Sequence, residues 1–137
     1  MIISIPGIII SGGWGGFASG FLTSVEVLNP ITGESCSLPA IPEDRSGHTM
    51  ENLTICGGSN STGGPGITNI TTTCITFSSG EWVTSNTLVE ERVSHSSWDT
   101  DAGTILFGGF YSPNTTEKVT QAENEGVPGF TLQHDLQ

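Results

Sequence analysis

A short β-prone run that ends in two glycines occurs three times in this chain, and this recurrence constrains the fold more than any other feature. The three copies are IIISGG at 8–13, LTICGG at 53–58 and TILFGG at 104–109. Gly57 follows Gly12 by 45 residues, and Gly108 follows Gly57 by 51. A period of roughly 20 to 50 residues is the signature of an array of similar structural units. We therefore expect three stacked modules, each marked by one glycine pair.

A second motif, R-x-x-H, recurs in phase with the glycine pairs. It stands at Arg45-Ser46-Gly47-His48 and again, 47 residues later, at Arg92-Val93-Ser94-His95. Because both residue types return at the module period, a structural role is favoured over catalysis for each of them. Each arginine is expected to bind buried carbonyl groups or a nearby carboxylate.

The pattern between these motifs predicts strands and turns. Val25 and Val27 alternate with Glu26, which is the period of a half-buried strand, and 73–78 and 81–85 are predicted to pair across a turn. The chain contains 19 glycines and only 12% charged residues, a composition that suits short strands joined by tight turns. No segment has a sustained apolar helical period. The sequence therefore predicts an all-β protein.

With its glycine pairs and R-x-x-H marks in phase, the chain resembles the kelch repeat. The second unit matches best, through Gly57-Gly58, Phe77, Gly80 and Trp82, whereas the first has Ser35 in the place of the tryptophan. The segments SCSLPAIPEDRSGHTM, LTICGG and ERVSHSSW are most similar to Cys-containing kelch-type proteins of invertebrates. The resemblance implies a fragment of a kelch-type β-propeller with about three four-stranded blades, the first and last incomplete. The approximate units are 1–42, 43–89 and 90–137. The repeat-structural residues it implies are Gly12, Gly13, Gly57, Gly58, Gly108, Gly109, Arg45, His48, Arg92, His95 and Trp82.

The cysteines and glycosylation motifs bear on the compartment. Cys56 and Cys74 are expected on adjacent antiparallel strands, where opposed Cβ atoms lie roughly 4.5–5.5 Å apart, close to disulfide range. We predict a Cys56–Cys74 bond, which leaves Cys36 without an assigned partner. Four N-x-S/T motifs are candidate glycosylation sites, and the last three are expected in loops: Asn52, Asn60, Asn69 and Asn114. These features favour an extracellular or secretory-pathway protein, the alternative being a cytosolic protein with three free thiols.

Charge and missing motifs exclude several classes of function. The chain has 14 acidic and 3 basic residues, a formal charge of −11, so nucleic acid and anionic membrane surfaces are poor partners. The apolar start is too short to span a membrane. No Cys-x-x-Cys, H-E-x-x-H or G-x-S-x-G motif is present, so no metal, cofactor or catalytic residue is expected.

Two functions remain open. The first is a non-enzymatic protein-interaction module that binds through rim loops, with exposed aromatic anchors. The candidate anchors, for which packing between blades is the alternative, are Trp14, Phe17, Phe21, Phe110 and Tyr111. The second is a fragment of an enzymatic or carbohydrate-binding propeller whose active residues lie elsewhere. In either case the end blades are expected to expose apolar residues such as Ile8, Ile10 and Phe130, which predicts self-association to complete a propeller.

Overall fold

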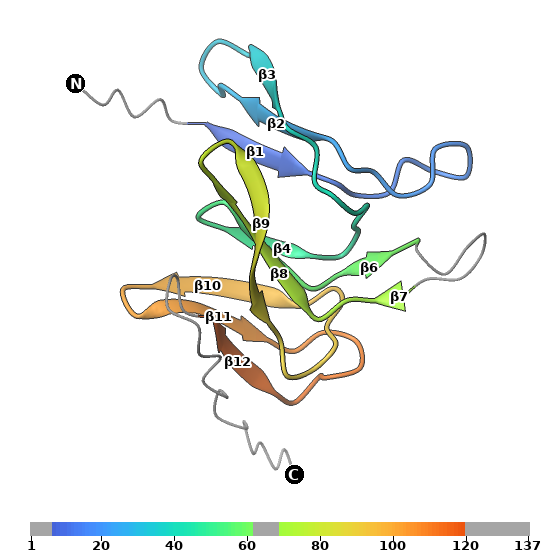
Figure 1. Ribbon diagram of the computed structural model, residues 1–137, viewed down its shortest axis with the longest axis vertical. Coiled ribbons are helices and arrows are strands. Elements are labelled where there is room, and N and C mark those ends of the chain that lie inside the picture. The colour runs from blue at the N-terminus through green and yellow to red at the C-terminus, as the bar shows by residue number, and fades with distance from the viewer. Residues whose placement is uncertain (1–6, 62–68, 120–137) are drawn as a thin grey trace.

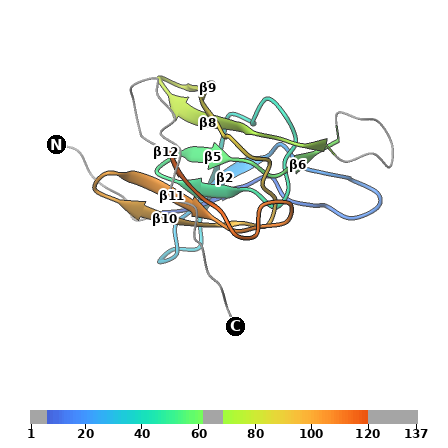
Figure 2. The ribbon, with the colours of Figure 1, turned by 90° about the horizontal axis from the view of Figure 1, so that it is seen from below.

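The computed structural model describes residues 7–61 and 69–119. Over these ranges the chain forms twelve strands in four antiparallel sheets and contains no helix, so the all-β prediction is confirmed. The three larger sheets lie one after another in chain order, and none of them closes on itself (Figure 1). The view from below looks along this stack, so strands of the three sheets overlap in it (Figure 2).

Each large sheet is built from one of the expected units. The first contains β1 (Ile8–Ser11), β2 (Val25–Leu28) and β3 (Ser35–Leu38). The second is a four-stranded meander of β4 (Thr49–Glu51), β5 (Thr54–Cys56), β8 (Thr73–Ser78) and β9 (Glu81–Thr87). The third contains β10 (Ser96–Thr100), β11 (Gly103–Phe107) and β12 (Thr116–Val119). A small ribbon of β6 (Ser59–Asn60) and β7 (Asn69–Ile70) projects from the second unit.

The three sheets share one strand order. A glycine pair follows β1, β5 and β11, and each of these strands pairs with the next long strand of its unit, β2, β8 or β12. Within the described ranges, the first sheet has no counterpart of β4 and the third has no counterpart of β9. Residues 120–137 of the third unit, which include Phe130, lie outside the described residues.

Two apolar cores lie between the sheets. Val25 and Ile41 of the first unit pack with Ile55 and Ile75 of the second, and Trp82 lies at the margin of this cluster. On the opposite face of the second sheet, a second cluster joins that unit to the third and contains Cys56, Cys74, Leu88, Leu106 and Val119. Because successive strand residues point to opposite faces, β5 and β8 contribute to both cores.

The predicted Cys56–Cys74 disulfide is present. The two residues are register partners on β5 and β8, and their sulfur atoms are 2.07 Å apart. Cys36 is a free, exposed thiol on β3. A disulfide of this kind is typical of proteins from oxidising compartments.

The glycine pairs hold neighbouring units together through the backbone. The N–H of Gly13 donates to the carbonyl oxygen of Arg45 at 2.6 Å, and the N–H of Gly58 donates to that of Arg92 at 2.8 Å. All six glycines have φ between 55° and 104°, a region that residues with a Cβ rarely occupy. A Cβ on Gly58 would also lie 2.9 Å from the oxygen of Ser46. The pairs are therefore favoured by backbone conformation, and Gly58 also by the close approach of the segment that contains Ser46.

Candidate ligand-binding site

The two recurring arginines point into their own units. Each side chain is 1% exposed. Nη1 of Arg45 donates to the carbonyls of Gly57 and Thr73, at 3.1 and 2.8 Å. In the third unit, Nη1 of Arg92 donates to the carbonyls of Gly108 and Thr115, at 3.0 Å each. The prediction that these guanidinium groups bind buried carbonyls is confirmed, and neither group is available at the surface.

Acidic residues accompany both arginines. Glu43 lies 3.8 Å from Arg45, and Glu90 lies 3.5 Å from Arg92, in each case two positions earlier in the chain. A third carboxylate, Glu117, is buried and lies 3.7 Å from Nε of Arg92. The repeated E-x-R spacing is a sequence signal that would have identified these carboxylates as arginine partners.

The two recurring histidines bridge adjacent units. Nε2 of His48 is 2.8 Å from the hydroxyl of Ser11, and Nε2 of His95 is 2.8 Å from that of Thr49. The Nδ1 atoms of both rings are buried without a partner among the described residues. Burial, and after it the charge of the nearby arginine, lower the pKa of both side chains, that of His95 to about 4. Both rings are therefore neutral at physiological pH and contribute to packing between units.

Exposed aromatic residues lie in the loops that follow two of the glycine pairs. The ring of Phe17 is fully exposed and meets that of Trp14 edge-on, with centroids 5.4 Å apart. Phe110 and Tyr111 are also exposed, in the loop after β11. Phe21 is different, because it is half-buried and its backbone pairs with that of Trp14, so the prediction of an exposed anchor at this position is wrong.

All the loops that follow glycine pairs lie on one side of the molecule. In Figure 1 the loop after β1, the β6–β7 ribbon and the loop after β11 are all on the right. We call this side the loop rim, comprising residues 14–22, 59–61, 69–72 and 110–115. The exposed aromatic residues thus share one rim, because the glycine pairs end equivalent strands.

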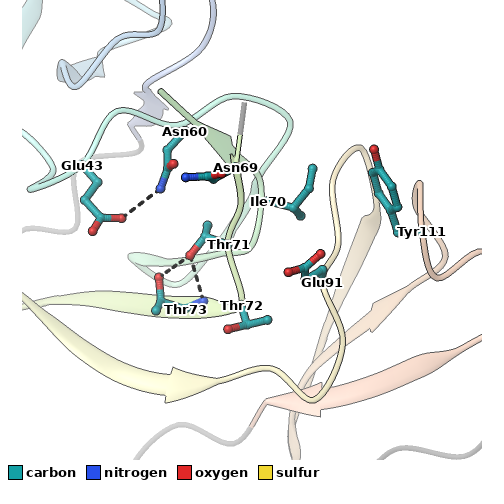
Figure 3. Close-up of a pocket in the computed structure, with 9 residues that line it drawn as sticks. All are labelled: Glu43, Asn60, Asn69, Ile70, Thr71, Thr72, Thr73, Glu91 and Tyr111. Atoms are coloured by element: carbon teal, nitrogen blue, oxygen red, sulfur yellow. Dashed lines mark hydrogen bonds between the residues drawn. The ribbon is translucent and has the colours of Figure 1, made fainter. Parts of the chain in front are cut away.

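A pocket of about 580 Å³ opens at this rim, between the second and third units (Figure 3). Its described lining residues are Glu43, Asn60, Asn69, Ile70, Thr71, Thr72, Thr73, Glu91 and Tyr111. In the close-up, Glu91 and Tyr111 of the third unit face the residues of the β6–β7 ribbon across the opening. Segments far apart in the sequence therefore form the pocket together.

The chemistry of the pocket is polar and acidic. Glu43 and Glu91 contribute carboxylates, and no basic side chain is found among the described lining residues. Nδ2 of Asn60 donates to Oε2 of Glu43 at 3.3 Å, which fixes one side of the opening. Ile70 and Tyr111 add apolar surface. Such a pocket suits a cationic group on an aliphatic stem, or a ligand rich in hydroxyl groups.

Tyr111 holds a strained backbone conformation at the mouth of the pocket. Its φ is 74°, which is unusual for an aromatic residue, yet its side chain is 74% exposed and gains little from packing. Strain that packing does not require is concentrated at functional sites in proteins. Tyr111 is therefore the residue that most clearly marks this pocket.

The candidate glycosylation sites differ in their exposure. Asn52, in the turn between β4 and β5, and Asn114, in the turn before β12, are exposed. Asn60 and Asn69 are register partners in the β6–β7 ribbon, so the loop prediction is wrong for both. Asn69 is exposed, but Asn60 is 95% buried, and its side chain has no room for a glycan in this fold.

Residues 7–61 and 69–119 contain no group of three or more His, Cys, Asp or Glu side chains able to hold a metal ion. In the same ranges there is no helix long and apolar enough to cross a membrane. Neither protein-family models nor curated protein sequences gave a match to this chain. The resemblance to kelch repeats therefore rests on the motifs and their spacing.

Proposed function

We propose that this chain is part of a kelch-type β-propeller and acts as a non-enzymatic module that binds a protein partner at the loop rim. The strand order repeated in three units and the equivalent glycine contacts support the propeller. One observation carries the function: the strained, exposed Tyr111 stands beside a pocket of about 580 Å³ on the rim that also bears Trp14 and Phe17. Aromatic anchors around a pocket are typical of protein-binding surfaces.

The pocket favours a partner that presents a lysine or arginine side chain. The carboxylates of Glu43 and Glu91 attract a cation, while Ile70 and Tyr111 can pack against its aliphatic stem. The formal charge of −11 attracts a basic partner at longer range. The bound segment would then extend along the rim towards Trp14 and Phe17.

Selection of peptides from a random phage-displayed library on the immobilised chain tests this function. We expect enriched peptides that contain Lys or Arg and bind with micromolar affinity. Tyr111→Gly should weaken their binding at least tenfold while leaving the melting temperature unchanged or higher, since glycine relieves the strain at φ 74°. Ile31→Ala, an exposed residue in the turn between β2 and β3, is the control and should bind normally. Equal binding by the Tyr111→Gly chain, or no enrichment, would contradict the proposal.

The polar lining of the pocket also supports a second candidate, a carbohydrate-binding module. Amide, hydroxyl and carboxylate groups can bind sugar hydroxyls, and Tyr111 can stack on a sugar ring. A glycan array probed with the same wild-type and Tyr111→Gly chains separates the two functions, because only the carbohydrate-binding candidate predicts Tyr111-dependent signals on it.

The disulfide and the exposed motifs at Asn52, Asn69 and Asn114 support an extracellular or secretory-pathway location. Binding through side chains that need no metal, cofactor or covalent step is compatible with that environment.

A further inference from the structure

The third sheet has an apolar face that no described residue covers. Along β11, Leu106 points into the core shared with the second unit, so its neighbours Ile105 and Phe107 point the other way. Trp98 is the register partner of Ile105 and is 70% exposed. Lys118 is the register partner of Ile105 on the other side, on β12. We call Trp98, Ile105, Phe107 and Lys118 the trailing face.

The first sheet also has an apolar face that is left open by the described part of the chain. Ile9 packs against the core shared with the second unit, while Ile8 and Ile10 point away and are each 52% exposed. Their register partners on β2 are Leu28 and Glu26. We call Ile8, Ile10, Glu26 and Leu28 the leading face.

The two faces correspond to the two halves of a junction that the chain already contains. At the junction between the second and third units, Cys56 and Cys74 lie on one side, and Leu106 and Val119 lie on the other. The trailing face lies mainly on β11 and β12. These strands are the equivalents, in the third sheet, of β5 and β8, which carry Cys56 and Cys74. The leading face lies on β1 and β2. These strands are the equivalents, in the first sheet, of β11 and β12, which carry Leu106 and Val119. An apolar strand of one face would therefore lie against an apolar strand of the other.

Charge makes the two faces complementary. Lys118 lies on β12 and Glu26 on β2, which are equivalent strands of the third and first sheets. At the internal junction, β8 and β12 contribute Cys74 and Val119 to one core cluster. Lys118 is one of only 3 basic residues, and the other two are buried arginines. The one remaining basic side chain therefore lies on the trailing face, and a carboxylate, Glu26, lies on the equivalent strand of the leading face.

We infer that the trailing face binds the leading face of a second copy of this chain. In this head-to-tail pairing, Trp98, Ile105 and Phe107 of one copy cover Ile8, Ile10 and Leu28 of the other, and Lys118 pairs with Glu26. Two copies of the given chain supply six such units, a number within the range of closed propellers. A ring in which both junctions form ends growth of this chain at the dimer. This pairing does not use the loop rim. The test of dimer formation is therefore independent of the test of partner binding at the rim.

Sedimentation velocity on the full chain tests the pairing, in a Cys36→Ser background that excludes a disulfide-linked dimer through this exposed thiol. We expect a dimer of twice the 14.3 kDa chain mass. Glu26→Lys and Lys118→Glu should each raise the dissociation constant at least tenfold, and the double exchange should restore it to within about threefold. Glu81→Lys, a charge reversal at the exposed start of β9, is the matched control and should leave it unchanged.

Circular dichroism melts of each variant show whether folding is intact, which is expected because Glu26 is exposed and Lys118 points away from the core. Three results would overturn the pairing: a monomer at all concentrations, an open-ended series of multimers, or a double exchange that does not restore association. Should a variant unfold, Ile10→Ser, at another exposed position of the leading face, replaces it and must weaken the dimer by the same criterion.

Discussion

At the scale of single residues, the two buried arginines determine the charge distribution of this chain. Arg45 and Arg92 are buried within their units, where they donate to backbone carbonyl oxygens. Each removes a positive charge from the surface, so the exterior is more acidic than the composition suggests. The neutral ring of the histidine three positions later then lies close to a fixed positive charge. Stability is therefore expected to depend on pH through these rings.

Acidification should destabilise the fold through His95. Its pKa is about 4 in the folded chain against an ordinary value of 6.5. Between these values the unfolded chain binds a proton that the folded chain does not. The stabilisation is therefore complete above pH 6.5 and lost as the pH falls towards 4, an effect of about 3 kcal/mol. Urea unfolding of wild type and His95→Gln at pH 7.5 and 4.5 measures it. The wild type should lose more stability than the variant, and an identical pH dependence would refute the role of His95.

At the scale of elements, strands with strong local patterns could be predicted from the sequence. Alternation predicted β2, and the turn at Ser79-Gly80 predicted that β8 pairs with β9. The β6–β7 ribbon could not be predicted, because its strands have only two residues each and consist of residues common in loops. Its formation depends on contacts with the neighbouring segment, such as the pairing of Ser46 with Ser59.

The pocket was equally inaccessible to sequence reasoning. Tyr111 was a candidate because it is aromatic and follows a glycine pair, but Glu43 and Glu91 have no local pattern that marks a pocket. The side chains of the neighbours Glu90 and Glu91 have different surroundings, since Glu90 accepts from Thr115 while Glu91 lines the pocket. Which loops meet across a unit junction depends on how the sheets stack, and single-sequence patterns do not contain that information.

The Cys56–Cys74 disulfide between β5 and β8 should contribute strongly to stability. It joins residues with a sequence separation of 18. Restricting the unfolded chain by a loop of this length raises the free energy of unfolding by about 3 kcal/mol. The double variant Cys56→Ser, Cys74→Ser should lose about that much in urea unfolding, whereas Cys36→Ser should lose almost nothing, because this thiol is exposed. Peptide mapping without reductant should recover a peptide pair linked through Cys56 and Cys74. A linked peptide containing Cys36 would contradict the assignment.

At the scale of the whole molecule, the second unit couples its neighbours. Ile55 and Ile75 face one core and Cys56 and Cys74 face the other, so disturbance of β5 or β8 affects both junctions. Arrays of this kind derive their stability from nearest-neighbour interfaces as much as from each unit. The three units should therefore unfold together.

Ile55→Ala tests this coupling. The side chain is fully buried, so its truncation should cost about 2–5 kcal/mol. In hydrogen exchange at increasing urea, β1–β3 and β10–β12 should lose protection at the same lowered urea concentration. Val83→Ala, at a half-exposed position on β9, should shift neither set. Loss of protection in one outer unit well before the other would mean that the units are independent.

Beside the apolar cores, backbone hydrogen bonds connect neighbouring units at repeated places, and this has a consequence for how such a chain can change. Gly13 bonds to the carbonyl of Arg45, Gly58 to that of Arg92, and the N–H of Ser94 to the carbonyl of Gly47. Because these bonds do not depend on side-chain identity, a unit can keep them while other residues of the unit vary, as the serine at 35 and the tryptophan at 82 illustrate. Whole units of such a chain can be duplicated, exchanged or removed by recombination without redesign of their neighbours. Their sequences can then diverge until little besides the glycines, the arginine and the histidine records their common origin.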